Sequence, residues 1–239
     1  LYGGEPLYNI GALENAKLAI KIFPGWQCHY YCRSDCNADI LEKLKKMSHV
    51  KVILMDGSAM IPMMWRFIPA FETKQTVIIR DTDSRLNIRE KLAVQEWLKS
   101  DKNIHIMRDH PWHSIEHAGT KIIGGMWGCR EGILNPCSEI FYNKAHLDEM
   151  NVNDEKLKLY GLDQIFLNND IYDKIVGDTM IHAKYNKYEK WAKNFPETNY
   201  NGFVGEIVHV NDRPSLINRL RMLAYRMKYS LKNKLQNSD

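Results

Sequence analysis

The stretch Thr76-Val77-Ile78-Ile79-Arg80-Asp81-Thr82-Asp83 places two carboxylates where an apolar, β-branched run ends. Residues of this kind favour a strand, and successive side chains of a strand point to opposite faces. Asp81 and Asp83 are therefore expected on one face, with Thr82 turned away. The polar residues that follow, beginning with Ser84 and Arg85, predict that the strand stops here. The acid pair would then lie at the carboxyl edge of a sheet, where open α/β sheets bind ligands.

Two interpretations of the acid pair remain open on spacing alone. Carboxylate oxygens suit Mg²⁺ or Mn²⁺, which usually complete their coordination with water and substrate phosphates. A solvated strand end that begins a turn carries the same residue types. The segments before and after the pair have to decide between a cation site and an ordinary turn.

Helix and strand patterns alternate around this strand. Pro24-Gly25 ends a helix, and Asn87 with Glu90 three residues later resembles a capping box that opens another. The order predicts an α/β, Rossmann-like fold with a mixed, mostly parallel central sheet flanked by helices. The expected helices are 12–23, 38–47, 59–67 and 88–99, and the expected strands are 26–31, 50–55, 76–79 and 104–107.

The second half of the chain is less regular. Residues 121–128 predict a strand leading into a glycine-rich turn, and residues 160–169 predict a short helix. The length of 239 residues fits one large domain. We expect this domain to span 1–212, followed by a basic amphipathic helix at 213–239.

Composition is that of a globular protein. Hydrophobic residues make up 44% and charged residues 26% of the chain, and no apolar stretch approaches the roughly 20 residues of a membrane span. Five cysteines are an odd number in a chain too long to need disulfides, which predicts a reducing, cytoplasmic location. No signal peptide is visible, but Leu1 is not an initiator methionine, so the true N-terminus stays open.

Five segments, in order, carry a resemblance to one enzyme family. They are Leu1-Tyr2-Gly3 with Ile10-Gly11-Ala12-Leu13-Glu14-Asn15-Ala16, Trp65-Arg66-Phe67-Ile68-Pro69-Ala70, Arg80-Asp81-Thr82-Asp83-Ser84-Arg85-Leu86, His105-Ile106-Met107-Arg108-Asp109-His110-Pro111 and Gly124-Gly125-Met126-Trp127-Gly128. With these segments the chain resembles glycosyltransferases of the GT-A fold, which carry a metal-binding Asp-x-Asp after a central strand. More narrowly, it is similar to microbial and large-DNA-virus proteins that include a chlorovirus glycosyltransferase domain. The resemblance covers residues 1 to about 130 well and the basic tail poorly.

The resemblance implies a hexosyltransferase-like enzyme. It would move a sugar from a nucleotide sugar, most simply a uridine diphosphate (UDP) sugar, to a glycan or lipid-linked acceptor. Residues 1 to about 130 would form the nucleotide-sugar-binding half and residues 131–212 the acceptor-facing half.

A divalent cation, Mn²⁺ or Mg²⁺, is the implied cofactor. It would bridge the two phosphates and, as a Lewis acid, stabilise the leaving diphosphate by several kcal/mol. Asp81 and Asp83 are the expected ligands, with Thr82 between them in the donor-binding motif. Enzymes of this fold often add a C-terminal histidine, for which His209 is the first candidate and His182 the second. A histidine of the surface or the core is the alternative for both positions.

The donor nucleotide has its own candidates. An aromatic ring that stacks and a glycine that permits close approach point to Leu1, Tyr2 and Gly3 for the base. Asp56 ends another expected strand and would accept hydrogen bonds from base or ribose, or else only form a turn. Arg66 lies on an otherwise apolar stretch, so its charge needs a phosphate or an acid of the Asp-x-Asp motif as partner.

The transfer step is assigned to Asp163 with Gln164. Asp163 would deprotonate the acceptor hydroxyl in an inverting enzyme or orient the sugar in a retaining one. Its alternative role is that of an acid favoured at a helix N-terminus. The residues expected to contact the donor sugar are Arg108, Asp109, Gly124 and Gly125, with Trp112 and Trp127 as platforms for its ring.

Other functions remain as alternatives. The basic helix suits peripheral contact with an anionic membrane, and packing on the domain is the competing interpretation. Nucleic-acid binding is not expected, because the charge is terminal and no nucleic-acid module accompanies it. A non-catalytic nucleotide-sugar or glycan-binding domain is the main alternative to the enzyme. A haloacid-dehalogenase-type phosphatase also uses Asp-x-Asp after an apolar strand, but normally near its first strand.

Overall fold

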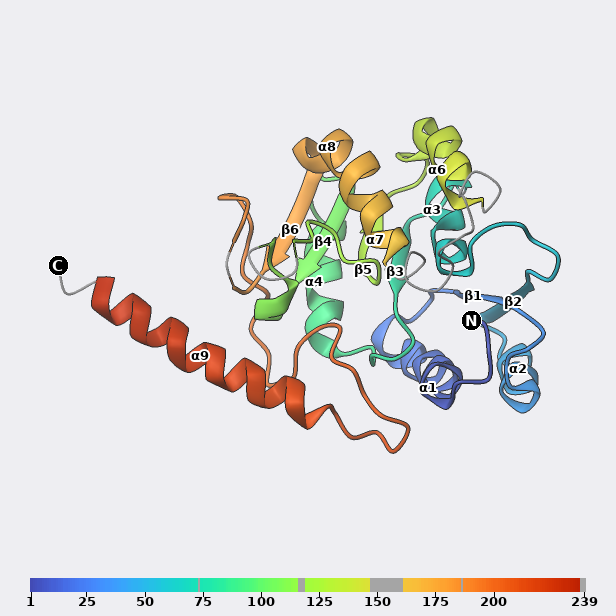
Figure 1. Ribbon diagram of the computed structural model, residues 1–239, viewed down its shortest axis with the longest axis horizontal. Coiled ribbons are helices and arrows are strands. Elements are labelled where there is room, and N and C mark those ends of the chain that lie inside the picture. The colour runs from blue at the N-terminus through green and yellow to red at the C-terminus, as the bar shows by residue number, and fades with distance from the viewer. Residues whose placement is uncertain (73, 116–118, 147–160, 186, 237–239) are drawn as a thin grey trace, which may run out of the picture.

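The computed structural model describes residues 1–236 except 73, 116–118, 147–160 and 186. Its strands form two sheets flanked by helices (Figure 1). The smaller sheet pairs β1 (Cys28–Cys32) with β2 (Val50–Leu54) in parallel. The larger has the order β3-β5-β4-β6, made of β3 (Val77–Arg80), β4 (Ile104–Arg108), β5 (Met126–Cys129) and β6 (Thr179–Ala183).

The mixed α/β class is confirmed, but the sheet is not mostly parallel. β4 and β6 run parallel, whereas β5 runs antiparallel to both β3 and β4. Two strands that follow one another in the chain can pair in parallel only through a crossover connection, which is usually an α-helix. Between β4 and β5 the structure describes the 3₁₀ turn Pro111–His113, and the glycine pair at 124–125 comes before β5 rather than after it. The chain therefore turns back antiparallel.

The helices follow the sequence signals closely where caps are strong. Asn87 Oδ1 accepts a hydrogen bond from Glu90 N at 3.1 Å, and Glu90 Oε1 accepts one from Asn87 N at 3.1 Å, so the expected capping box opens α4. The expected helix at 59–67 is instead a 3₁₀ helix, Pro62–Phe67, continued by α3. The described α-helices are α1 (Pro6–Ile22), α2 (Ala38–Lys45), α3 (Ile68–Glu72), α4 (Ile88–Leu98), α6 (Ser138–Ala145), α7 (Leu162–Phe166), α8 (Tyr172–Ile175) and α9 (Leu216–Gln236).

The core lies on both faces of the larger sheet. On one face, helices α3, α6 and α7 pack phenylalanines against the strands and α8 adds Tyr172 and Ile175, and the rings of Phe71 and Phe141 stack with centroids 4.5 Å apart. On the other face, α4 packs Trp97 over His105 of β4, with ring centroids 5.3 Å apart. Alternation along β4 explains both contacts, because Ile104 and Ile106 face the first layer and His105 faces the second. The carboxyl end of β3 is thereby held rigidly.

Candidate active site

The acid pair follows directly after β3, and a single arginine ties it to a distant helix. Arg66, from the 3₁₀ helix Pro62–Phe67, donates from Nη1 to Asp81 Oδ1 and from Nη2 to Asp163 Oδ2. Asp163 is the second residue of α7 and is 4% exposed, whereas Asp81 is half-exposed. The expectation that Arg66 needs an acidic partner from the Asp-x-Asp motif is confirmed. Arg66 also brings together Asp81 and Asp163, which are far apart in the sequence.

The glycine pair before β5 makes this cluster sterically possible. A Cβ at Gly124 would lie 2.5 Å from both Arg66 Nη2 and Asp163 Oδ2. A Cβ at Gly125 would overlap the carboxylate of Asp81. Both glycines are buried and neither has a positive φ, so they are needed here for close approach rather than for backbone conformation. The site therefore unites four separated segments of the chain, at residues 66, 81, 124–125 and 163.

Charge is unbalanced in the cluster. Burial, and then the neighbouring charge of Asp81, raise the pKa of Asp83 to about 6, and Arg66 and Arg85 lower it less strongly. Burial lowers the pKa of Arg66, but Asp81 and Asp163 outweigh it, so that pKa is raised overall. Arg66 pairs with two carboxylates, those of Asp81 and Asp163, and the charge of Asp81 still raises the pKa of Asp83. A divalent cation between Asp81 and Asp83 would relieve this excess of negative charge.

The expected third metal ligand is wrong for both histidines. Among the described residues, no group of three or more His, Cys, Asp or Glu side chains is arranged to hold a metal. His209 is exposed in a turn, where its backbone N donates to Arg213 O at 2.9 Å. Its neighbour Val208 does reach the motif, because Val208 N donates to Asp83 O at 2.8 Å. Asp81 and Asp83 would therefore hold a cation with water and phosphate oxygens completing the shell.

His182 has an internal role. It is fully buried on β6, with Nδ1 2.9 Å from His105 Nε2 and Nε2 3.2 Å from Glu96 Oε2. Burial is the main cause that lowers the pKa of both imidazoles, so they pack as neutral rings. His182 belongs to the α4 side of the sheet and is excluded as a metal ligand.

The residues expected to hold the nucleoside lie together at the carboxyl ends of β1 and β2. Gly3 N donates to Asp35 Oδ1 at 2.8 Å, and Ser34 donates from N and Oγ to Asp56 Oδ1 at 3.0 and 2.8 Å. Leu1 joins them, because Leu1 O accepts from Arg33 N at 3.0 Å. We call this group, residues 1–3 with 33–35 and 56, the polar rim.

The polar rim adjoins the acid cluster. The ring of Tyr2 meets that of Trp65 edge-on, with centroids 6.4 Å apart, and Trp65 precedes Arg66 in the chain. The motif residue Thr82 is half-buried, and its carbonyl oxygen is so close to Gly11 of α1 that a Cβ there would overlap it. Tyr2 is 46% exposed, and Asp56 is exposed as well. The rim thus offers an exposed ring and an exposed carboxylate.

Arg108 and Asp109 do not face this site. Arg108 is 1% exposed, and both its terminal nitrogens donate to Glu189, at 2.7 and 2.8 Å. Asp109 is also buried; it accepts from Arg89 at 2.6 and 2.8 Å and from Val204 N at 3.0 Å. Their expected contacts with donor-sugar hydroxyls are therefore replaced by internal ion pairs, because a buried charge has to be paired.

Of the two tryptophans expected to carry the sugar ring, one is buried and one is exposed. Trp127 is fully buried in the core, which excludes it as a surface for a sugar ring, whereas Trp112 is 52% exposed. Gln164 lies beside Asp163 and is half-buried, and its backbone oxygen accepts from Asn168 Nδ2 at 2.6 Å.

Asn168 is a supporting residue that the sequence pattern did not indicate. Its Oδ1 accepts from the backbone N of Lys121 and of Ile122, the latter at 3.1 Å, and its Nδ2 donates to Ile122 O at 3.0 Å. These bonds fasten the segment before Gly124 to the helical layer that carries Asp163. The sequence feature that could have indicated this role is a polar amide directly after the apolar residues Phe166 and Leu167.

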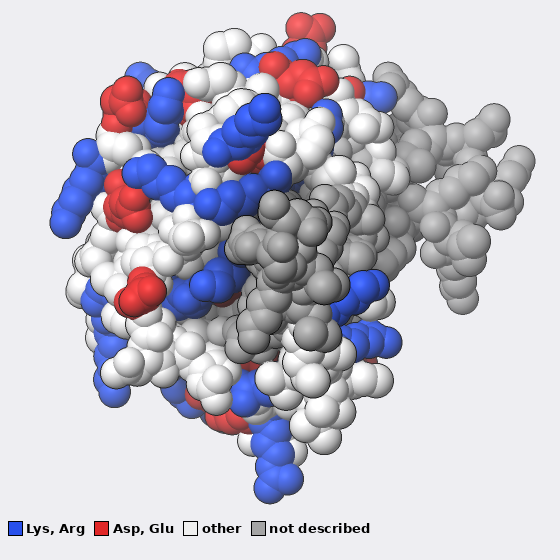
Figure 2. Space-filling model, turned by 90° about the vertical axis from the view of Figure 1, so that its left-hand side faces the viewer, with Lys and Arg blue, Asp and Glu red and all other residues white. Residues whose placement is uncertain are grey.

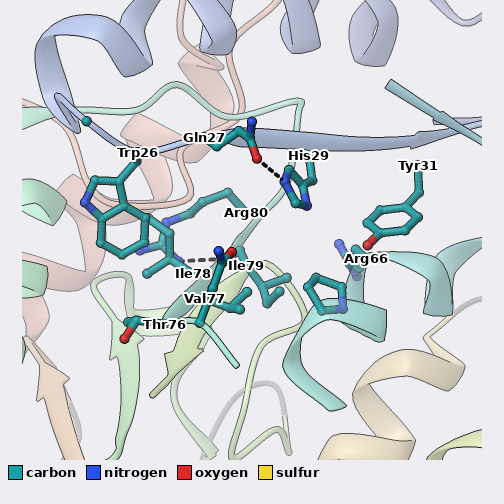
Figure 3. A pocket seen from close by; sticks show the side chains of 13 residues that line it. Trp26, Gln27, His29, Tyr31, Arg66, Thr76, Val77, Ile78, Ile79 and Arg80 are labelled. Atoms are coloured by element: carbon teal, nitrogen blue, oxygen red, sulfur yellow. Dashed lines mark hydrogen bonds between the residues drawn. The ribbon is translucent and has the colours of Figure 1, made fainter. Parts of the chain in front are cut away.

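A pocket of about 420 Å³ opens between β1 and β3 (Figure 3). Gln27, His29 and Tyr31 line one side, and residues 76–80 line the other. The two strands are not paired with each other in the described structure. Arg66 belongs both to this lining and to the acid cluster, so a ligand in the pocket would lie beside its guanidinium. Nothing in the sequence predicted that these two strand edges face each other.

Comparison with protein-family models, curated proteins and solved structures gave no match for this chain. The resemblance to GT-A glycosyltransferases therefore stays a prediction. The function has to be argued from the geometry and charge of the site.

Proposed function

We propose that this chain is a metal-dependent glycosyltransferase that uses a nucleotide sugar as donor. The observation that carries the proposal is the double ion pair of Arg66, which joins Asp81 to Asp163 although Arg66 and Asp163 are 97 residues apart. A donor has a charged diphosphate and a reacting sugar within a few ångströms of each other. A cation-binding acid, a phosphate-binding arginine and a second acid side by side suit that pair of groups.

The acidic and basic residues of the site have different roles toward the donor. A divalent cation, Mn²⁺ or Mg²⁺, supplies Lewis-acid stabilisation of the departing diphosphate when it is bound. Asp81 and Asp83 offer the oxygen ligands that such an ion prefers. Nη1 and Nη2 of Arg66 each donate to one aspartate, and the side chain is 28% exposed, so the remaining N–H groups of these two nitrogens give the guanidinium donor capacity for a phosphate oxygen.

Asp163 is the residue we assign to the sugar side of the site. In an inverting reaction its carboxylate takes the proton of the acceptor hydroxyl as that oxygen bonds to the anomeric carbon and the diphosphate leaves. In a retaining reaction it orients the donor sugar by accepting a hydroxyl hydrogen bond. Its low exposure and its bond to Arg66 fix its position in either case. The absence of side chains at Gly124 and Gly125 leaves room for Asp163 and Asp81 to take these positions.

The polar rim suits the nucleoside. Tyr2 presents an exposed ring for stacking, and Asp56 presents an exposed carboxylate as acceptor for base or ribose donors. Uridine is the base we propose, with a glycan or lipid-linked acceptor. The phosphatase alternative is disfavoured, because the acid pair follows β3, the third strand along the chain, and not the first.

Calorimetry with a panel of nucleotide sugars, with Mn²⁺ and with chelator, tests this proposal. We expect one uridine diphosphate sugar to bind with Mn²⁺ and its affinity to fall at least about tenfold with chelator, because two carboxylates alone repel a diphosphate. Slow release of nucleoside diphosphate from that donor should follow. Binding without release or transfer to any acceptor would favour the non-catalytic alternative, and equal binding in chelator would contradict a role for the metal.

A further inference from the structure

Helix α9 exposes a continuous apolar row. Leu216, Leu220, Leu223 and Met227 are 71%, 55%, 50% and 69% exposed, and their spacing of three or four residues puts them on one side of the helix. We call these four residues the apolar row. Single exposed apolar residues need no explanation, but a row of this kind marks an interaction surface.

The opposite side of α9 is fastened to the body of the protein. Met222 is buried, and Arg219 bonds to Glu206 at 2.6 and 3.1 Å. The guanidinium of Arg221 lies 4.8 Å from the ring centre of Trp112. These contacts come from the first two turns, and beyond them the helix extends away from the sheets (Figure 1). The orientation of α9 therefore leaves the apolar row uncovered by the described residues.

Positive charge accompanies the row. Between residues 213 and 236 the sequence has no acidic residue, and its basic residues are Arg213, Arg219, Arg221, Arg226, Lys228, Lys232 and Lys234. At 100° per residue, Arg221 and Lys228 fall on one flank of the row and Arg219 on the other. Figure 2 shows that Lys and Arg side chains are spread over the face of the molecule from which α9 extends, interspersed with Asp and Glu side chains.

We propose that α9 is a membrane-surface helix whose apolar row enters the headgroup region of an anionic bilayer. An apolar row between basic flanks is the pattern of helices that lie in the membrane interface. Anionic lipid headgroups complement the basic flanks, and their attraction acts within about a Debye length of the surface. None of the described helices is long and apolar enough to cross a membrane, so α9 lies on the bilayer rather than through it.

A second copy of the chain is the competing occupant of the row. Two α9 helices packed through their apolar rows would bring the basic flanks of both copies together without any acid from α9 to offset them. Like charges at such distances repel. The charge pattern therefore favours a lipid surface over self-association. This inference does not rest on the proposed glycosyltransferase activity.

Co-sedimentation with vesicles tests the proposal. The full chain should bind vesicles containing 30% phosphatidylserine at least about tenfold more tightly than pure phosphatidylcholine vesicles, and 0.5 M salt should remove most of that difference. The double variant Leu220→Glu with Leu223→Glu should lower binding at least tenfold. Ile20→Glu, at an equally exposed position of α1, is the matched control and should bind like the parent.

Two results would overturn the proposal. One is equal binding of the parent to both vesicle types. The other is a stable dimer in sedimentation velocity that the Leu220→Glu, Leu223→Glu variant converts to monomer, with no vesicle binding by the parent. Circular dichroism of each variant, matched to the parent, ensures that loss of binding reflects the surface and not unfolding.

Discussion

Replacing Asp83 with Asn should weaken Mn²⁺-dependent binding of the donor by about 100-fold, equivalent to about 2.7 kcal/mol. The substitution keeps the size of the side chain but removes one of the two anionic oxygen groups that we assign to the cation. Calorimetry with the donor and Mn²⁺ measures the change. An unchanged affinity and an unchanged response to chelator would contradict the assignment.

The thermal stability of the metal-free Asp83→Asn variant is the control, and the direction of its expected change follows from the pKa of Asp83. The pKa of Asp83 in the folded chain is raised from 3.8 to about 6, so the folded state binds a proton more tightly than the unfolded state. Stability of the parent therefore falls as pH rises from about 4 to about 6 and stays lower above that. Asn carries no such cost. The variant should melt at an equal or higher temperature than the parent at pH 7, and this advantage should vanish near pH 4.

Replacing Asp163 with Asn should lower the rate of sugar transfer by about 10² to 10⁴-fold, the range expected when a general base is removed. Asn still accepts the hydrogen bond from Arg66, so donor affinity should change by less than about threefold, well under 1 kcal/mol. Steady-state kinetics with the donor and a nucleoside diphosphate titration separate the two effects. The decisive feature is a fall in kcat with donor binding retained.

Asp173→Asn is the matched control for that variant. Asp173 is an exposed acid of the neighbouring helix α8, paired at the surface with Lys121 at 3.2 Å, and its loss should leave transfer unchanged. If Asp163→Asn retained the parental rate, Asp163 would be only a packing partner of Arg66 and the transfer chemistry would have to lie elsewhere.

The sequence predicted those parts of the site that follow from local rules. Asp81 and Asp83 were expected at the carboxyl end of a β-branched strand, and they do follow β3; because β3 ends at Arg80, the turn after it, and not the alternation of a strand, sets the directions of the two side chains. The position of Arg66 on an apolar stretch predicted an acidic or phosphate partner, and the structure pairs Arg66 with Asp81. Gly124 and Gly125 were expected to let a donor sugar approach the backbone, whereas in the structure the space beside them is taken by Arg66, Asp81 and Asp163. Each of these predictions depended on neighbours within a few residues.

Contacts between residues far apart in the sequence are the part of the structure that the sequence did not predict. The exposure of Arg108 depends on Glu189, which is 81 residues away, and Asp109 is fixed by Arg89 and Val204. A charged residue at a strand end is compatible with a binding site or a buried ion pair, and only the tertiary partner decides. The same holds for β5, whose direction depends on the path of the chain after β4, and for His209, which a tight turn keeps at the surface.

Anomalous diffraction from crystals grown with Mn²⁺ and uridine diphosphate would test the cation site most directly. The account predicts one manganese peak within about 2.1 Å of a carboxylate oxygen of both Asp81 and Asp83, with the diphosphate touching Arg66. A diphosphate bound in the crystal with manganese elsewhere, or with no manganese, would contradict it.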